Sequence, residues 1–183
     1  YLFMKSKAKV VVIGGSGFIG SHTADVLSEK GFQVVIFDSR ESKWLRQDQE
    51  MIVGDILDVD QVRNAVSGSK YVYHFAGISD IDESRVRPFE TINLNVMGAV
   101  TALNAAQLAG VKRFLYASTM YVYSPLGSFY RASKQAAETL IEAYQGEYKL
   151  DYTLLRYGSL YGRRANEFNF IRNAITQALL EGK

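Results

Sequence analysis

The stretch GGSGFIGSH, residues 14–22, directly follows the apolar run VVVI at residues 10–13. Three of its glycines, Gly14, Gly17 and Gly20, are spaced three residues apart, and a helical pattern of apolar residues follows them. Glycine weakens regular structure, so its concentration at one turn indicates that another group approaches the backbone closely there. These residues predict a strand, a tight glycine turn and a helix.

Short apolar runs alternate with longer segments of helical periodicity along the rest of the chain. The expected strands are 10–13, 34–37, 51–53, 71–75, 114–117 and 152–155. The expected helices are 18–30, 59–66, 89–109, 130–148 and 166–180, and the charged segment 39–50 leaves room for only a short helical crossover. Strands separated by helices build a parallel sheet that is covered on both faces. The fold class is therefore predicted as α/β, with a Rossmann-type doubly wound parallel sheet.

The composition predicts one ordinary domain. A chain of 183 residues is long enough for one sizeable core. Its net charge of +2 gives no field that would attract nucleic acid or an anionic membrane. The chain has no cysteine and only two histidines, which argues against a metal site. No apolar run reaches the roughly 20 residues of a membrane-spanning helix, so we expect a cytoplasmic protein that binds neither nucleic acid nor membranes.

The glycine turn has the sequence context of a dinucleotide-binding site. Helix N-terminal amides after such a turn bind phosphate. The spacing can be parsed in two ways: Gly15-x-Gly17-x-x-Gly20 matches the general dinucleotide fingerprint, and Gly14-x-x-Gly17-x-x-Gly20 matches a variant of it. Asp38 ends the second expected strand, where a carboxylate accepts hydrogen bonds from an adenosine ribose and repels a 2′-phosphate. This favours NAD over NADP. Arg40 weakens the preference, because its guanidinium could receive that phosphate or stack on adenine.

A second motif predicts catalysis. Tyr130 and Lys134 are four residues apart at the start of an expected helix, which places them on one face. A free tyrosine has a pKa of about 10, and a nearby ammonium lowers that pKa by favouring the phenolate. Ser118 and Thr119 follow the fifth expected strand, where a doubly wound sheet places its ligand-binding loops. A hydroxyl there could hold a substrate oxygen while Tyr130 removes its proton.

Together these motifs resemble those of the extended short-chain dehydrogenase/reductases, and most closely the NAD-dependent epimerase/dehydratase family that acts on nucleotide sugars. The resemblance rests on seven motifs in family order, which are GGSGFIGSH at 14–22, GDILD at 54–58, HFAG at 74–77, NVMG at 95–98, AST at 117–119, YRASK at 130–134 and LRY at 155–157. It implies Thr119, Tyr130 and Lys134 as the catalytic residues, with Thr119 preferred to Ser118.

The resemblance also implies where a cofactor binds. Asp55 and Ile56 would flank the adenine, a turn at 75–77 would pass under the cofactor, Asn95 would hold the active-site helix and a water, and Tyr157 would face the nicotinamide. The cofactor-binding residues expected in this way are Gly14, Gly17, Phe18, Ile19, Gly20, Asp38, Arg40, Asp55, Ile56, Phe75, Ala76, Gly77, Asn95, Tyr130, Lys134 and Tyr157.

Two departures from the family pattern limit the assignment. Met120 and Tyr121 stand where family dehydratases carry an acidic residue. The loop 123–130 is short, and the chain ends at Lys183, where the family continues into a substrate-binding domain. We therefore expect one NAD(P)-binding domain over residues 4–183, with the small C-terminal substrate domain largely absent from this chain.

The expected function is NAD-dependent epimerisation of a nucleotide sugar through transient hydride transfer, with Tyr130 as the acid and base. The alternatives are an NAD(P)-dependent reductase or dehydrogenase acting on a sugar or another carbonyl, and a non-catalytic protein that senses dinucleotides. The alanine-rich faces of 89–109 and 130–148 suggest a homodimer, although packing within one chain explains them almost as well. Arg163 and Arg164 could contact substrate phosphates or form an exposed basic pair.

Overall fold

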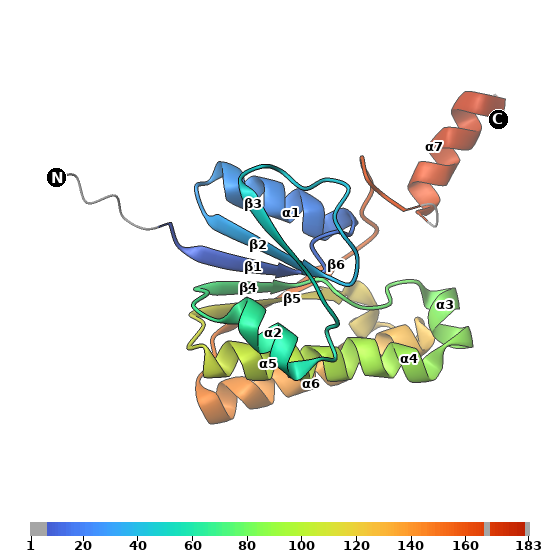
Figure 1. The fold of residues 1–183 in the computed structure, drawn as a ribbon. Helices are drawn as coiled ribbons and strands as arrows, with labels where there is room; N and C mark the ends of the chain where they lie inside the picture. Colours follow the sequence, from blue (N-terminus) through green and yellow to red (C-terminus); the bar gives the residue numbers. More distant parts are fainter. Residues whose placement is uncertain (1–6, 167–168, 182–183) are drawn as a thin grey trace.

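The computed structural model describes residues 7–166 and 169–181 of the chain. The strands in this part are β1 (Lys9–Ile13), β2 (Gln33–Asp38), β3 (Gln49–Val53), β4 (Tyr71–His74), β5 (Arg113–Thr119) and β6 (Tyr152–Tyr157). They form one sheet in the order β3-β2-β1-β4-β5-β6, and every pairing is parallel (Figure 1). This order confirms the predicted doubly wound α/β fold of the Rossmann type.

Helices cover both faces of the sheet (Figure 1). The α-helices are α1 (Phe18–Glu29), α2 (Val59–Val66), α3 (Ile81–Val86), α4 (Pro88–Ile92), α5 (Gly98–Leu108), α6 (Ser128–Tyr148) and α7 (Phe170–Glu181). Ala24 and Leu27 of α1 pack on Val10 and Val12 of β1 at one face. The next residues of the same strand, Val11 and Ile13, contribute to the larger core beneath α2, α5 and α6. Strand β1 is thus buried on both sides, which explains its unbroken apolar sequence.

The segment 89–109 is helical, as predicted, but it is not one regular helix. A π-helix, η1 (Asn93–Met97), lies between α4 and α5. A π-helical turn inserts an extra residue into the helical repeat, which changes the direction in which the side chains on that turn point. Four alanines of α5, namely Ala99, Ala102, Ala105 and Ala106, are buried in the core of the chain itself.

Other differences concern short elements. The helical crossover expected in 39–50 is not found: most of the segment is turns and loop, and its end forms the start of β3. Helix α3 was not predicted, because its six residues are too few to show a helical period. Helix α7 begins at Phe170 rather than at 166, and residues 167–168 of that prediction lie outside the described part, as do residues 4–6 and 182–183 of the predicted domain. No helix in the described ranges is long and apolar enough to cross a membrane.

We expect Gly20→Ala to lower the free energy of unfolding by about 3 kcal/mol, because overpacking against a backbone atom cannot be relieved by a rotamer change. An added Cβ at Gly20 would lie 2.2 Å from the carbonyl oxygen of Gly14. Urea denaturation followed by circular dichroism measures the change.

Gly146→Ala is the matched control. Gly146 lies in α6, and nothing would come within 4 Å of an added Cβ there. Because alanine favours a helix over glycine by about 1 kcal/mol, this variant should be more stable than the natural chain. Equal effects at the two positions would contradict the close packing of the glycine turn.

Candidate active site

A cleft of about 1030 Å³ opens at the carboxyl ends of the strands. In a doubly wound sheet this is the side on which ligands bind, at the point where the strand order reverses, here between β1 and β4. Twelve of the residues predicted for the site line this cleft, namely Gly14, Gly17, Phe18, Ile19, Gly20, Arg40, Phe75, Gly77, Thr119, Tyr130, Lys134 and Tyr157. The fold therefore brings the glycine turn and the tyrosine–lysine motif to one cavity.

The glycine turn offers free backbone donors to this cleft. Gly17 is the N-cap of α1 and has no side chain to bind the first amides of the helix, and the first turn contains no acidic residue. An α-helix carries partial positive charge at this end. At Gly14, which has φ +79°, an added Cβ would lie 2.5 Å from the backbone nitrogen of Ala76. The uncapped amides and the side-chain-free backbone fit the diphosphate of a dinucleotide.

Asp38 holds the loop after β2 against the glycine turn. Its Oδ2 accepts a hydrogen bond from the Ser16 backbone N–H at 3.0 Å, and its Oδ1 accepts one from the Arg40 N–H at 3.3 Å. The Ser16 hydroxyl in turn donates to the Arg40 carbonyl at 2.8 Å. These contacts place the Asp38 carboxylate beside the cleft and Arg40 in its lining.

Other predicted cofactor-binding residues are held by contacts beside the cleft and do not belong to its described lining. Asp55 is exposed and accepts a hydrogen bond from the Leu57 N–H at 2.9 Å. Ile56 is buried in the core against Gly98. The backbone of Ala76 closes on Gly14, as described above.

The three predicted catalytic residues come from two elements. Thr119 is the last residue of β5, and Tyr130 and Lys134 lie one turn apart on α6. The Lys134 ammonium donates to the Ala117 carbonyl oxygen at 2.9 Å and lies 4.6 Å from the ring centroid of Tyr116. Burial lowers the pKa of Lys134 to about 8, while the carboxylate of Glu138 acts in the opposite direction.

The pKa of Tyr130 differs from the expectation. Burial raises it above the ordinary value of a tyrosine, and a side-chain hydrogen bond with Thr119 opposes this increase. The expected lowering by Lys134 is not found for the protein by itself. The reason is geometric: the Lys134 Nζ is directed at the Ala117 carbonyl and lies 5.9 Å from the Tyr130 ring centroid.

Ser118 and Thr119 are adjacent but have different partners. The Ser118 hydroxyl donates to Glu138 Oε1 at 2.5 Å. Thr119 instead interacts with Tyr130, and its Oγ1 accepts a hydrogen bond from the Tyr121 N–H at 3.3 Å. This arrangement favours Thr119 over Ser118 as the hydroxyl that works with Tyr130.

Asn95 connects the turn after β4 to helix α6. It lies in η1 and is fully buried. Its Oδ1 accepts a hydrogen bond from the Ile78 N–H at 2.7 Å, and its Nδ2 donates to the Ser133 hydroxyl at 2.9 Å. Ser133 donates to the Tyr130 carbonyl at 2.7 Å. Asn95 therefore contacts residues around the site and lies outside the described lining of the cleft.

Several parts of the lining were not expected from the sequence, including Leu160, Asn166 and residues 169–171 around the start of α7. Ser79 to Asp82, before and at the start of α3, line the cleft, as do Met120 and Tyr121 of the 3₁₀-helix η2 (Met120–Tyr123). The pattern Asp80-x-x-Glu83 was a usable signal, because Asp80 Oδ1 accepts a hydrogen bond from the Glu83 N–H at 2.7 Å as an N-cap. Tyr121 is exposed at the cleft.

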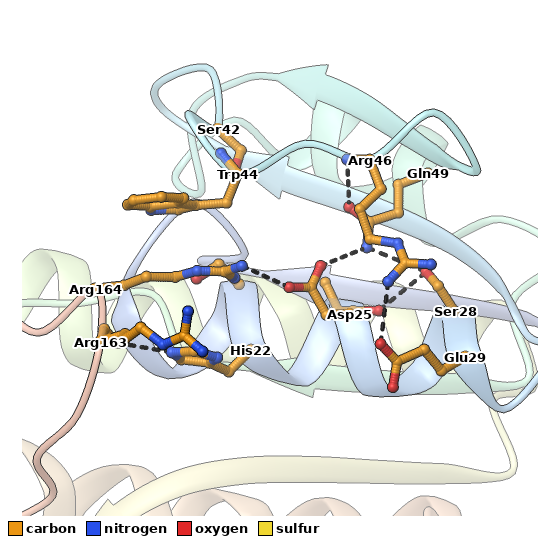
Figure 2. Close-up of polar contacts among 12 residues, drawn as sticks. His22, Asp25, Ser28, Glu29, Ser42, Trp44, Arg46, Gln49, Arg163 and Arg164 are labelled. Atoms are coloured by element: carbon orange, nitrogen blue, oxygen red, sulfur yellow. Dashed lines mark hydrogen bonds and ion pairs between the residues drawn. The ribbon is translucent and has the colours of Figure 1, made fainter.

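A crossing segment, residues 158–166, leads from β6 at the sheet edge to helix α1 (Figure 2). His22 Nε2 forms a hydrogen bond with the Arg163 carbonyl at 2.8 Å. Arg164 pairs with Asp25 at 2.8 Å and stacks 4.7 Å from the ring centroid of Trp44. Arg164 is thus not half of an exposed basic pair, and it lines the cleft together with other residues of this segment beside the glycine turn.

Comparison with known proteins agrees with this geometry. The sequence pattern described as "NAD dependent epimerase/dehydratase family" matches residues 10–183. The dTDP-D-glucose 4,6-dehydratase of Mus musculus is 34% identical over an alignment that covers 84% of this chain and 51% of that protein. The chain thus spans about half the length of this curated relative.

Solved structures are also similar. The UDP-glucose 4-epimerase of Thermotoga maritima, determined with UDP-glucose, superposes with a TM-score of 0.87 at 27% identity, over 96% of this chain and 64% of that chain. The UDP-glucose 4-epimerase of Thermus thermophilus, a complex with NAD, gives a TM-score of 0.84 at 26% identity, over 95% and 63% of the two chains.

The contact between Arg164 and Trp44 has its own optical probe, because Trp44 is the one tryptophan of the chain. We expect Arg164→Ala to shift the Trp44 emission to longer wavelength and to increase its quenching by acrylamide, since the stacked guanidinium shields the indole. Arg46→Ala is the control, because Arg46 lies on the same loop as Trp44. This variant loses an exposed ion pair with Glu29 of α1, and the Trp44 emission should not change. Identical spectra for the natural chain and the two variants would contradict the stacking of Arg164 on Trp44 in Figure 2.

Proposed function

The chain belongs to the NAD dependent epimerase/dehydratase family, and we propose on that basis that it is an NAD-dependent epimerase of a nucleotide sugar. The observation that carries the proposal is that Thr119, Tyr130 and Lys134 line the same cleft as the uncapped N-terminus of α1. A phosphate-binding helix end and a proton-transferring phenol are thereby available to one ligand site.

Residues of the cleft would divide the cofactor between them. The free amides of Phe18 to Gly20 would hold the diphosphate, and Asp38, Asp55 and Ile56 would lie at the adenosine end. Phe75, Gly77 and Tyr157 would lie at the nicotinamide end. When bound, NAD would accept a hydride from a sugar carbon, return it to the other face of that carbon, and bring a positive charge close to Tyr130.

Tyr130 would move the proton of this reaction. It would take the proton from a ring hydroxyl that Thr119 holds by a hydrogen bond. Because burial raises the pKa of Tyr130 in the protein itself, the phenolate needs stabilisation by cations. A lowering of about three pKa units corresponds to roughly 4 kcal/mol. Lys134, fixed beneath the phenol, would supply part of this stabilisation while its ammonium stays charged.

Epimerisation fits the cleft better than elimination of water. Elimination needs an acid near the catalytic hydroxyl, and Met120 and Tyr121 occupy the positions after Thr119. The acidic side chains in the described lining come from elsewhere: Asp80 caps α3, and Asp82 pairs with Arg85 at 2.7 Å. Neither carboxylate is held toward Thr119 by a described contact.

We also propose that the protein is a homodimer. Phe89, Met97 and Leu108 are exposed along α4, η1 and α5, which supports an apolar interface on this side of the molecule. Sedimentation equilibrium tests this proposal, and a single species with the mass of one chain at micromolar concentration would refute it.

We expect Tyr130→Phe to abolish epimerisation while NAD binding stays within about twofold, because one phenol oxygen is removed and the glycine turn is untouched. Turnover is measured on the full-length gene product with UDP- and dTDP-linked sugars, and binding is measured by calorimetry. Full turnover in this variant would remove Tyr130 from the mechanism. Cofactor absorbance is followed in parallel, since a reductase would change it stoichiometrically with product and an epimerase would not.

A further inference from the structure

The strongest unassigned polar cluster lies behind the catalytic residues, where α6 meets the carboxyl ends of β5 and β6. Glu138 lies one helical turn after Lys134 and is almost fully buried. Its Oε1 accepts hydrogen bonds from the Ser118 hydroxyl at 2.5 Å and from Arg156 Nε at 3.0 Å, and its Oε2 accepts one from an Arg156 terminal nitrogen at 2.7 Å. One carboxylate therefore joins a helix to two neighbouring strands.

The register of the sheet puts this junction next to the reacting groups. Ser118 of β5 pairs with Arg156 of β6, and the following residues, Thr119 and Tyr157, pair with each other. Both of these following residues line the cleft. The Glu138 contacts thus hold the second-to-last residue of each strand, and the last residue of each strand lines the cleft.

We propose that Glu138 is a positioning residue for the proposed reaction: its carboxylate fixes the end of β5 that carries Thr119 and supplies the negative charge that keeps the buried Lys134 ammonium ionised. This inference rests on the proposed function for its effect on turnover, but its effect on Lys134 belongs to the folded chain alone. Arg156 weakens the effect of Glu138 on Lys134, because the positive charge of Arg156 neutralises part of the Glu138 carboxylate.

Among the described groups around Lys134, Glu138 is the one that supplies a negative charge to the ammonium. The titratable groups near the ammonium are Tyr130 and Glu138 on α6, Tyr116 on β5 and His74 on β4. Arg156 on β6 binds the carboxylate of Glu138. Burial lowers the pKa of His74 to about 3, with Lys134 acting in the same direction, so the imidazole is neutral. Burial raises the pKa of Tyr116 far above its usual value, so its phenol is neutral as well.

Glu138 itself is held in the charged form. Burial raises the pKa of its carboxyl, but the hydrogen bonds from Arg156 and Ser118 outweigh that effect, and the pKa lies below its usual value. The carboxylate is thus ionised throughout the range in which Lys134, with a pKa of about 8, gains or loses its proton. Removal of this charge lowers the pKa of Lys134 further, whereas removal of the Arg156 charge raises it.

Two variants that break the ion pair between Glu138 and Arg156 distinguish two roles of Glu138: an effect of its charge on Lys134, and structural support alone. In Glu138→Gln, the titration midpoint of Lys134 should move down by about 1 to 2 pH units, and in Arg156→Gln it should move up. The midpoint is read by NMR of isotope-labelled lysine side chains without substrate, and Lys134→Arg identifies the signal. Shifts of the same sign in both variants, or no shift in either, would overturn the proposal.

Turnover gives an independent readout. The alkaline decline of kcat should begin at lower pH in Glu138→Gln and at higher pH in Arg156→Gln, while Glu138→Asp, which keeps the charge, should restore most of the natural profile. Glu142→Gln is the matched control, since Glu142 is exposed one turn further along α6 and should leave the profile unchanged. If Glu138→Gln does not fold, the sign of the Lys134 shift in Arg156→Gln still decides the proposal. A chain that proves to have no epimerase activity would still show the shifts of Lys134.

Discussion

The direct contact between the backbone of the glycine turn and the end of β4 is the constraint on which the rest of the site depends. A Cβ at Gly14 would come within 2.5 Å of the Ala76 nitrogen, and one at Gly20 within 2.2 Å of the Gly14 oxygen. Side chains at these positions would separate α1 from the sheet. Because none is present, the helix N-terminus lies at the same sheet edge at which β5 delivers Thr119 and α6 delivers Tyr130. The proposed cofactor site and the proposed proton-transferring groups are thus connected through backbone packing rather than through a shared side chain.

Most of the fold followed from the sequence because its determinants are local. All six strands were expected within one or two residues at most ends, and α2 was expected with its observed bounds, since a buried parallel sheet leaves apolar runs and α2 has a strong capping residue in Asp58. The π-helix η1 could not be predicted, because one extra residue in a helical turn leaves the apolar pattern nearly intact. Yet this turn carries Asn95, which binds both Ile78 and Ser133.

The sequence predicted which residues come together in the candidate site, but it did not predict the pKa of Tyr130. Thr119, Tyr130 and Lys134 converge because Thr119 ends β5 and the other two lie in the first two turns of α6, and the topology directs both elements to one edge. The pKa of Tyr130 depends instead on how deeply its ring is buried, and the sequence does not contain that depth. The contacts around Glu138 and Arg164 join residues that are far apart in the chain, such as His22 and Arg163, which are separated by 141 positions. Periodicity and spacing carry no information about such pairs.

The two ends of the cleft provide positive charge in different ways. At one end, the dipole of α1 offers partial positive charge without any ionised side chain, so no desolvation cost of a buried cation arises. At the other end, the proposed reaction requires a localised charge to favour a phenolate, and the buried Lys134 would provide it. Burial lowers the pKa of Lys134 to about 8 although the carboxylate of Glu138 acts in the opposite direction. A buried lysine that is to act as a cation therefore needs a carboxylate close enough to keep the ammonium ionised. That carboxylate must also be partly neutralised, so that it does not cancel the positive charge of the lysine. Glu138 meets both conditions, because Arg156 binds both of its oxygens while the Lys134 ammonium keeps the Ala117 carbonyl as its hydrogen-bond partner.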